Sequence, residues 1–407
     1  MKRSDLSNYL IHFVHSKDPS QLPDHLPEYI ENICYNFSYH ISEYNEYSSL
    51  VNIIKEGGLR FGYSFRNKKT TLYGDSPVIC FTEMPFSNFL EYVAKRNDKY
   101  KVSSYGIAFR KADLFKLGAR PVIYGLSKNI SNNYESNKNY ERILNHNVLP
   151  YEEQYRLVSL NLNDSSKSDW THEREWRLKL DKKAHEYIFC QKEGFEYCEI
   201  PGIHIFDKQK SIQETIIITQ KKEEASDLNE RIQILLDSGS NIYDVPVNNK
   251  IRILVIEEYL KSSSQILDIS DLPESCFFSV NKPIISNDLL EKVKHHIEIA
   301  KNKVTEVAYK EFLKLQNRTE TSDSWIDFGG PCGFGFIKCN SPNDKVLRAM
   351  IKLGIANSCG NYYEIDAIGK QIPHSQSIDY NEFIAKRISE YLNKELSNVF
   401  HYSSKMD

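Results

Sequence analysis

Residues 172–177, His-Glu-Arg-Glu-Trp-Arg, place two glutamates two positions apart in a stretch that alternates like a β-strand. Side chains two residues apart on a strand point to the same face. We therefore expect Glu173 and Glu175 to share one face of a strand in the N-terminal half, about 6–7 Å apart at the backbone. Arg177 would return to that same face.

Two carboxylates beside an arginine suit several chemical tasks. They can hold a ribose, polarise a nucleophile or bind a metal ion. Trp170 and Trp176 flank the pair and are two of the three tryptophans in the chain, so the carboxylates would lie in a partly dry setting that shifts their pKa. The alternative is an exposed strand whose Glu and Arg side chains pair across the surface.

The length of 407 residues exceeds what one ordinary hydrophobic core supports, so two domains are expected. A polar segment at 237–250 predicts the boundary, with an N-terminal domain at 1–245 and a C-terminal domain at 246–407. The formal net charge of −3 implies no overall attraction to nucleic acid or anionic lipid. A local basic patch is compatible with this net charge.

Several classes of protein lack support in the sequence. No apolar run approaches the ~18–20 residues of a membrane helix, and no signal-peptide core follows Met1, so we expect a cytoplasmic protein with no membrane association. The eight cysteines form no CxxC pair and no zinc-like spacing, so no metal site is predicted. A P-loop, a GxGxxG after a strand, HExxH and GxSxG are also missing.

Apolar patterning predicts the remaining elements. Strands are expected at 10–14, 77–82, 105–109, 120–124, 170–178, 215–219 and 251–256, and helices at 49–57, 88–96, 224–236, 289–315 and 343–353. The glycine-rich stretch 329–335 is expected to form a bulged or tight β-turn. Because strands and helices are interspersed without a regular βαβ rhythm, an α+β fold is predicted for both domains.

Polar residues at two strands are further candidates for a site. His12 lies alone in the apolar strand 10–14, where a satisfied core histidine is the ordinary alternative to a ligand-binding one. Thr82 and Glu83 follow at the end of strand 77–82, a usual place for ligand contacts.

Six motifs occur in one order along residues 8–235. They are Leu10-Ile-His-Phe-Val14, the helix end Gly57-Gly-Leu-Arg60, Pro77-Val-Ile-Cys-Phe-Thr-Glu-Met-Pro85, Tyr105-Gly-Ile-Ala-Phe-Arg-Lys111, Arg120-Pro-Val-Ile-Tyr124 and Glu173-Arg-Glu-Trp-Arg177. This series resembles the AbiGi-like abortive phage infection family, with valine at position 14 where the family usually has threonine. The motifs Asp323-Ser-Trp-Ile-Asp-Phe-Gly329 and Gly360-Asn-Tyr-Tyr-Glu364 resemble an uncharacterised domain that often accompanies it.

The same layout is similar to small ADP-ribosyltransferases of the DNA-modifying toxin kind, which implies a split-sheet fold and NAD as substrate. On this resemblance His12 would hydrogen-bond the NAD ribose, and Glu173 or Glu175 would stabilise the oxocarbenium-like centre as nicotinamide leaves. A rival match to the first motif is Tyr39-His40-Ile-Ser42, which lies closer to helix 49–57. The NAD-binding residues that the resemblance implies are His12, Phe13, Arg60, Phe81, Thr82, Glu83, Tyr105 and Arg177.

Three hypotheses about function follow. The leading one is an antiphage effector or toxin that transfers ADP-ribose from NAD to a nucleic acid or protein, with a C-terminal domain that senses infection or binds a partner. The alternative is a non-catalytic antitoxin or regulator that binds a partner toxin or phage component, in which Glu173, Glu175 and Arg177 form a structural ion-pair cluster. A third is a metal-dependent nuclease that uses His12, Glu83 and the two glutamates.

Overall fold

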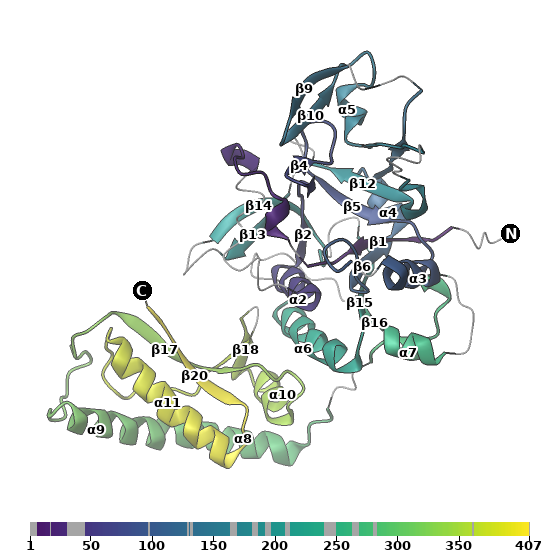
Figure 1. Ribbon diagram of the computed structural model, residues 1–407. Helices are drawn as coiled ribbons and strands as arrows, with labels where there is room; N and C mark the ends of the chain where they lie inside the picture. Colours follow the sequence, from purple (N-terminus) through teal and green to yellow (C-terminus); the bar gives the residue numbers. More distant parts are fainter. Residues whose placement is uncertain are drawn as a thin grey trace. The chain divides into compact units, whose positions relative to one another are not determined.

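Helices and strands are interspersed along the whole chain, which confirms the predicted α+β class (Figure 1). None of the described helices combines the length and apolar character needed to cross a membrane. The computed structural model describes residues 6–16, 18–30, 45–96, 98–127, 130, 133–162, 169–180, 186–191, 197–207, 212–239, 250–262, 268–279, 283–359 and 362–406.

The chain divides into two compact units. The first comprises residues 1–228 and 243–278, and the second comprises 229–242 and 279–407. The predicted boundary between residues 245 and 246 differs from this division, because β16 (Ile251–Val255) belongs to the first unit. β16 pairs in parallel with β15 (Thr215–Thr219), so this apolar run extends the first sheet instead of starting a new core.

Seven of the strands in the described ranges form the main sheet of the first unit, in the order β16-β15-β6-β1-β5-β12-β7. β1 lies at its centre, and its apolar run is buried accordingly. Each neighbouring pair is antiparallel except β15 with β16. The bounds are Tyr9–Phe13 (β1), Val78–Thr82 (β5), Gly106–Arg110 (β6), Arg120–Pro121 (β7) and Glu175–Lys179 (β12).

The strand register assigns side chains to the two faces of this sheet. Ile11 lies opposite Thr82, and Thr82 lies opposite Glu175, so these three side chains share one face. Residues one position away, such as His12, point to the other face. We call the first of these the α3 face, because buried phenylalanines of α3 (Phe86–Arg96) belong with Ile11 to one hydrophobic cluster.

Shorter elements complete the first unit. Helix α2 (Glu46–Glu56) ends at Gly57, whose φ of 64° and backbone N–H bonds to Ile53 and Ile54 form the predicted glycine cap. Other helices are α4 (Lys111–Lys116), α5 (Tyr151–Gln154), α6 (Lys222–Ser238), which continues into the second unit, and α7 (Ile256–Lys261). Small sheets contain β2 (Gly58–Arg60) with β14 (Tyr197–His204) and β13 (Glu186–Gln191), β3 (Phe65–Arg66) with β4 (Lys69–Thr70), β8 (Ile123–Tyr124) with β11 (Leu157–Val158), and β9 (Tyr134–Lys138) with β10 (Glu141–Leu144).

The predicted strand at 170–178 is wrong in its first half. Residues Thr171–Glu173 form a single 3-10 turn, and β12 begins only at Glu175. Between them Arg174 adopts a left-handed conformation with φ of 47°, which lies outside the β region and so interrupts the predicted strand. Glu173 and Glu175 therefore do not share one strand, and the simple two-residue spacing argument for their geometry fails.

The second unit packs helices against a four-stranded sheet, counted over the part of the chain that the structure describes. The strand order is β18-β19-β17-β20, with bounds Ala356–Ser358 (β18), Tyr363–Ile365 (β19), Gly333–Cys339 (β17) and Phe400–Met406 (β20). The long helix predicted at 289–315 is present as α8 (Asn287–Ile299), a π-helical segment (Ala300–Val304) and α9 (Thr305–Leu315). The other helices are α10 (Lys345–Lys352) and α11 (Ile378–Glu395).

The glycine-rich stretch serves two purposes. Gly329 and Gly330 have positive φ values of 69° and 82°, which fits the predicted turn. Gly333 and Gly335, in contrast, lie within β17, where α11 approaches the strand closely. A Cβ on Gly335 would lie 2.1 Å from the backbone oxygen of Asn381, so only glycine permits this helix–strand packing.

Candidate functional site

The turn that carries Glu173 is held next to the end of β5 by two hydrogen bonds to its backbone. The Thr82 hydroxyl donates to the backbone oxygen of Glu173 at 2.5 Å, and the backbone N–H of Glu83 donates to the oxygen of Arg174 at 3.2 Å. The end of β5 thus fixes the 3-10 turn before β12. Thr82, predicted as a ligand contact, acts here on the position of the glutamate.

The Glu173 carboxylate lies in a polar cluster on α3. Its Oε1 accepts from the Tyr92 hydroxyl at 2.5 Å and from Nη1 of Arg96 at 3.2 Å, and Arg96 also donates to the Tyr92 oxygen. The Glu173 side chain is 21% exposed. Burial raises the pKa of Glu173 above its ordinary range, and the negative charge of Glu175 raises it further, although Tyr92 and Arg96 act in the opposite direction.

Glu175 forms a buried ion pair with Arg177 on the α3 face. Nε and Nη2 of Arg177 donate to the two carboxylate oxygens at 2.7 and 3.2 Å, and the two side chains are 14% and 7% exposed. Nη1 of Arg177 donates to the backbone oxygens of Tyr155 and Leu157 at 2.6 and 3.3 Å. The expectation that Arg177 lies beside the glutamates is therefore correct for Glu175, and the pair is bidentate.

We call Glu173 and Glu175 the acid pair, and further aromatic and cationic side chains lie on the Glu173 side of it. The indole of Trp170 contacts two guanidinium groups, with Arg66 4.9 Å and Arg96 5.0 Å from its ring centroid. The rings of Tyr92 and His172 are 5.1 Å apart. Such distances are typical of cation–π and tilted aromatic contacts.

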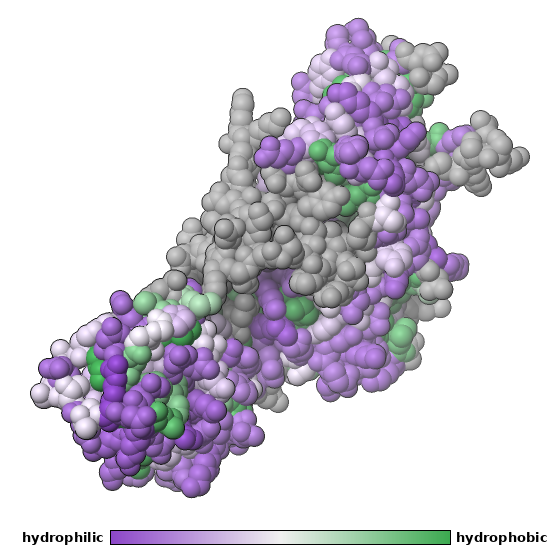
Figure 2. Space-filling model, turned by 60° about the vertical axis from the view of Figure 1, so that its left-hand side comes forward, coloured by the Kyte–Doolittle hydropathy of each residue, from purple (hydrophilic) through white to green (hydrophobic). Residues whose placement is uncertain are grey.

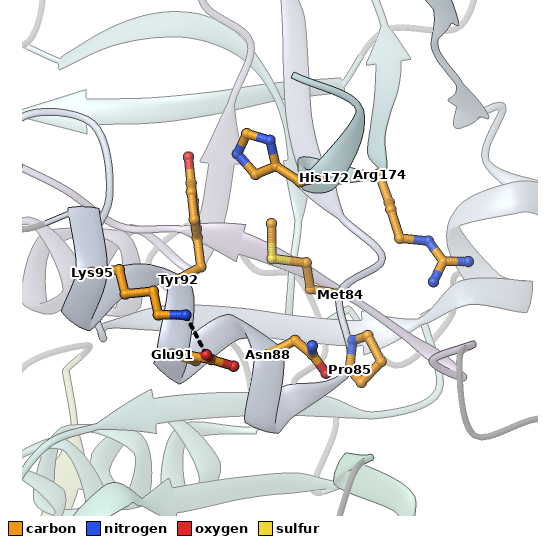
Figure 3. Close-up of a pocket in the computed structure, with 8 residues that line it drawn as sticks. All are labelled: Met84, Pro85, Asn88, Glu91, Tyr92, Lys95, His172 and Arg174. Carbon is orange, nitrogen blue, oxygen red and sulfur yellow. Dashed lines mark hydrogen bonds and ion pairs between the residues drawn. The ribbon is translucent and has the colours of Figure 1, made fainter. Parts of the chain in front are cut away.

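A surface cavity of about 360 Å³ adjoins this cluster. In Figure 3, α3 lines it with Tyr92, Glu91 and Lys95, while Arg174 lies on the opposite side. The remaining residues that line it are Met84, Pro85, Asn88 and His172. Tyr92 thus connects the cavity to the Glu173 carboxylate.

His12 does not join the acid pair on the α3 face. The register places it on the opposite face, where its ring lies 6.0 Å from that of Phe81. Its Nδ1 is 2.9 Å from the backbone oxygen of Cys80. In the pairing of β1 with β5, Ile11 lies opposite Thr82. His12 is the next residue of β1, and its ring contacts the backbone of Cys80 on β5. The sheet therefore places His12 and Glu175 on opposite faces.

The other predicted NAD-binding residues lie in separate contacts. Glu83 is 9% exposed and accepts from Lys111 and from the Trp176 indole, each at 2.8 Å. Phe13 stacks on Phe89 at 5.2 Å, on the α3 face. The two remaining residues pair with acids on helices: Arg60 bonds Glu56 of α2, and the Tyr105 hydroxyl donates to Glu224 of α6 at 2.6 Å.

Sequence reasoning missed Tyr92 and Arg96 as neighbours of Glu173. The helix predicted at 88–96 does place Tyr92 and Arg96 four residues apart on one face. Nothing in that pattern says which distant segment the face meets. The rival motif Tyr39-His40-Ile-Ser42 lies outside the described residues.

Comparison with known proteins gives no relative. No family model, no curated protein and no solved structure matches the chain. In the described part of the chain, no group of three or more His, Cys, Asp or Glu side chains has the arrangement of a metal site.

Proposed function

We propose that the first unit is an ADP-ribosyltransferase-like enzyme that uses NAD in antiphage defence, with a cytoplasmic nucleic acid or protein as acceptor. The observation that carries the proposal is the acid pair, held at one end of β12. Beside it Arg66, Trp170 and Arg96 form what we call the cationic and aromatic wall. The resemblance of the motif series indicates ADP-ribosyl transfer from NAD as the reaction. The residues of the site are the ones that we assign to its steps.

Glu173 is the carboxylate that we assign to the reaction. In the transfer, the bond between ribose C1 and the nicotinamide nitrogen breaks, and nicotinamide leaves with the bonding electrons. Positive charge develops at C1, and a nearby carboxylate stabilises it. The acceptor then forms a bond to C1 and gives its proton to Glu173, whose raised pKa suits a proton acceptor.

Glu175 has a different role in this proposal. Its two oxygens are bound by Arg177, and its charge adds to the effect of burial, which is the main cause of the raised pKa of Glu173. The wall formed by Arg66, Trp170 and Arg96 supplies the cations and the flat ring that a dinucleotide with a pyrophosphate requires.

A non-catalytic regulator is the second candidate, and one observation favours it. Both carboxylates of the acid pair already have partners within the chain, Glu173 with Tyr92 and Arg96, and Glu175 with Arg177. A purely structural ion-pair cluster would have the same contacts. In that case the unit would bind a partner toxin or a phage component without consuming NAD.

Purified wild type and the Glu173→Gln variant, incubated with radiolabelled NAD and a cell extract, separate the two candidates. The enzyme transfers label in a reaction that Glu173→Gln abolishes, while the exposed control Glu152→Gln on α5 retains it. Growth of expressing bacteria and phage plaquing efficiency should follow the same order. If no variant and no wild-type preparation transfers label or consumes NAD, with or without phage infection, the enzyme proposal fails.

A further inference from the structure

The sheet of the second unit has one face that no described helix covers. Side chains alternate along β17, so that Ile337 and Cys339 are fully buried whereas Phe334 is 60% exposed. Phe336 and Lys338 are partly exposed and share the face of Phe334. Helix α11 packs on the opposite face, against Gly333 and Gly335. In Figure 2, hydrophobic residues lie exposed among hydrophilic ones on this unit, at the lower left.

The register extends this open face, as we call it, onto the neighbouring strands. Three residues of β20 lie on it: Lys405 opposite Phe334, Ser403 opposite Phe336, and His401 opposite Lys338. On the other side of β17, Lys338 lies opposite Glu364, and Glu364 lies opposite Asn357 of β18. Nζ of Lys338 is 3.4 Å from the Ser403 hydroxyl, which agrees with this assignment.

Part of the open face is hollow. A cavity of about 400 Å³ is lined by Phe336, Asn357 and Glu364, among others. The ring of Phe336 also stacks on Tyr362, with centroids 5.7 Å apart and planes 21° from parallel. The hollow therefore combines a flat aromatic wall with an amide and a carboxylate.

We propose that the open face binds a single-stranded nucleic acid. Phe334 and Phe336 are two positions apart on one strand, about 6–7 Å at the backbone, which suits two successive unstacked bases. Stacking on aromatic side chains of an exposed sheet is a general mode of single-strand recognition. The aromatic rings need access to base planes, and a closed duplex does not offer them.

Basic and acidic side chains lie on different strands of the open face: Lys405 and His401 on β20 and Glu364 on β19, with Lys338 of β17 between them. Lys338 and Lys405 lie beside the two phenylalanines, where they meet backbone phosphates, and the His401 ring offers a hydrogen-bonding group next to Lys338. The acidic residues Glu364 and Asp366 line the hollow, where a base edge enters and no phosphate does. A carboxylate there accepts from an exocyclic amine such as N4 of cytosine, so bases that carry an amine are preferred to uracil or thymine.

The test uses the full chain and fluorescent single-stranded RNA and DNA, about 10 nucleotides long, with a duplex of the same sequence as a third probe. Anisotropy should report binding of single strands and much weaker binding of the duplex. The Phe334→Ala/Phe336→Ala variant should bind at least tenfold more weakly, because each lost stacking contact has a large effect. Comparison of the RNA and DNA probes identifies the sugar preference.

Matched variants keep the outcome interpretable. Leu315→Ala on α9 and Lys394→Gln on α11, both exposed, should retain wild-type affinity. Lys338→Gln/Lys405→Gln should reduce the salt dependence, lowering the slope of log K against log salt by about 1.4 for two lost phosphate contacts. Glu364→Gln should change the preference among bases and leave the salt slope unaltered.

The proposal does not depend on NAD chemistry, so Glu173→Gln should bind the oligonucleotides as well as the wild type does. It is overturned if no single strand binds at about 10⁻⁴ M protein, the weak end of non-specific binding. It is also overturned if the double phenylalanine variant, shown to be folded by circular dichroism, binds as tightly as the wild type.

Discussion

Replacing Arg177 with methionine removes the cation of the buried pair with Glu175 and leaves a carboxylate whose side chain is 14% exposed. Methionine keeps the apolar volume but donates to neither carboxylate oxygen, nor to the backbone oxygens of Tyr155 and Leu157. Breaking a buried pair on one side costs about 3–5 kcal/mol of unfolding free energy. For a unit of this size that corresponds to a fall in Tm of about 6–20 °C.

The double variant Arg177→Met/Glu175→Gln separates the charge from the packing. It removes the stranded carboxylate as well, so it should regain at least about 1 kcal/mol relative to Arg177→Met alone. Lys261→Met, which breaks the exposed pair with Glu258, serves as the control and should change stability by less than about 1 kcal/mol.

Calorimetry and urea denaturation of the four proteins measure these differences. The reasoning is refuted if Arg177→Met costs no more than the Lys261→Met control. It is equally refuted if the double variant is less stable than Arg177→Met, because the remaining Glu175 charge would then not be the source of the cost.

Three further predictions concern Glu173, Tyr92 and Gly335. The pKa of Glu173 is raised in the folded state, so its ionisation destabilises the fold above that pKa and has no effect below the pKa of the unfolded chain. Glu173→Gln should therefore raise Tm near neutral pH. This gain should disappear as the pH falls through the acidic range. A gain that is independent of pH would contradict the burial of this charge. Tyr92→Phe removes a hydrogen bond that lowers the pKa of Glu173, so the carboxyl resonance of Glu173 should titrate at higher pH in an NMR experiment; a downward shift would refute the assignment. Gly335→Ala should destabilise the second unit by about 1–3 kcal/mol, because its Cβ would overlap the backbone of Asn381, whereas Gly62→Ala, with open space around it, should be nearly neutral in the same denaturation assay.

The local signals in the sequence predicted individual elements well. The apolar runs at 10–14, 77–82 and 105–109 correspond to β1, β5 and β6 within one or two residues. The helix that ends at Gly57 has the expected left-handed cap. These elements depend on periodicity and on glycine, both of which are properties of neighbouring residues.

The 3-10 turn that ends at Glu173 could not be predicted from such local signals. The alternation through residues 172–177 is compatible with a continuous strand, and Arg174 is not a residue type that signals a left-handed conformation. Bonds from Thr82 and Glu83 to this turn join segments about ninety positions apart in the chain. Such tertiary contacts override a local pattern.

Long-range pairing also decided where the first unit ends. The strand at 251–256 looks like the start of a new domain because a polar segment precedes it. Its parallel partner β15 cannot be identified from its own composition. For the same reason, the separation of His12 and Glu175 onto opposite faces required the register of β1, β5 and β12.

Release of nicotinamide from NAD by the purified protein tests the central claim most directly. Chromatographic quantification should show release by the wild type and by the exposed control Glu152→Gln, and none by Glu173→Gln. His12→Ala should retain a measurable rate, because His12 lies on the face of the sheet opposite Glu175. Release that persists undiminished in folded Glu173→Gln, or the absence of release from the wild type with acceptor-containing extract, would contradict the account.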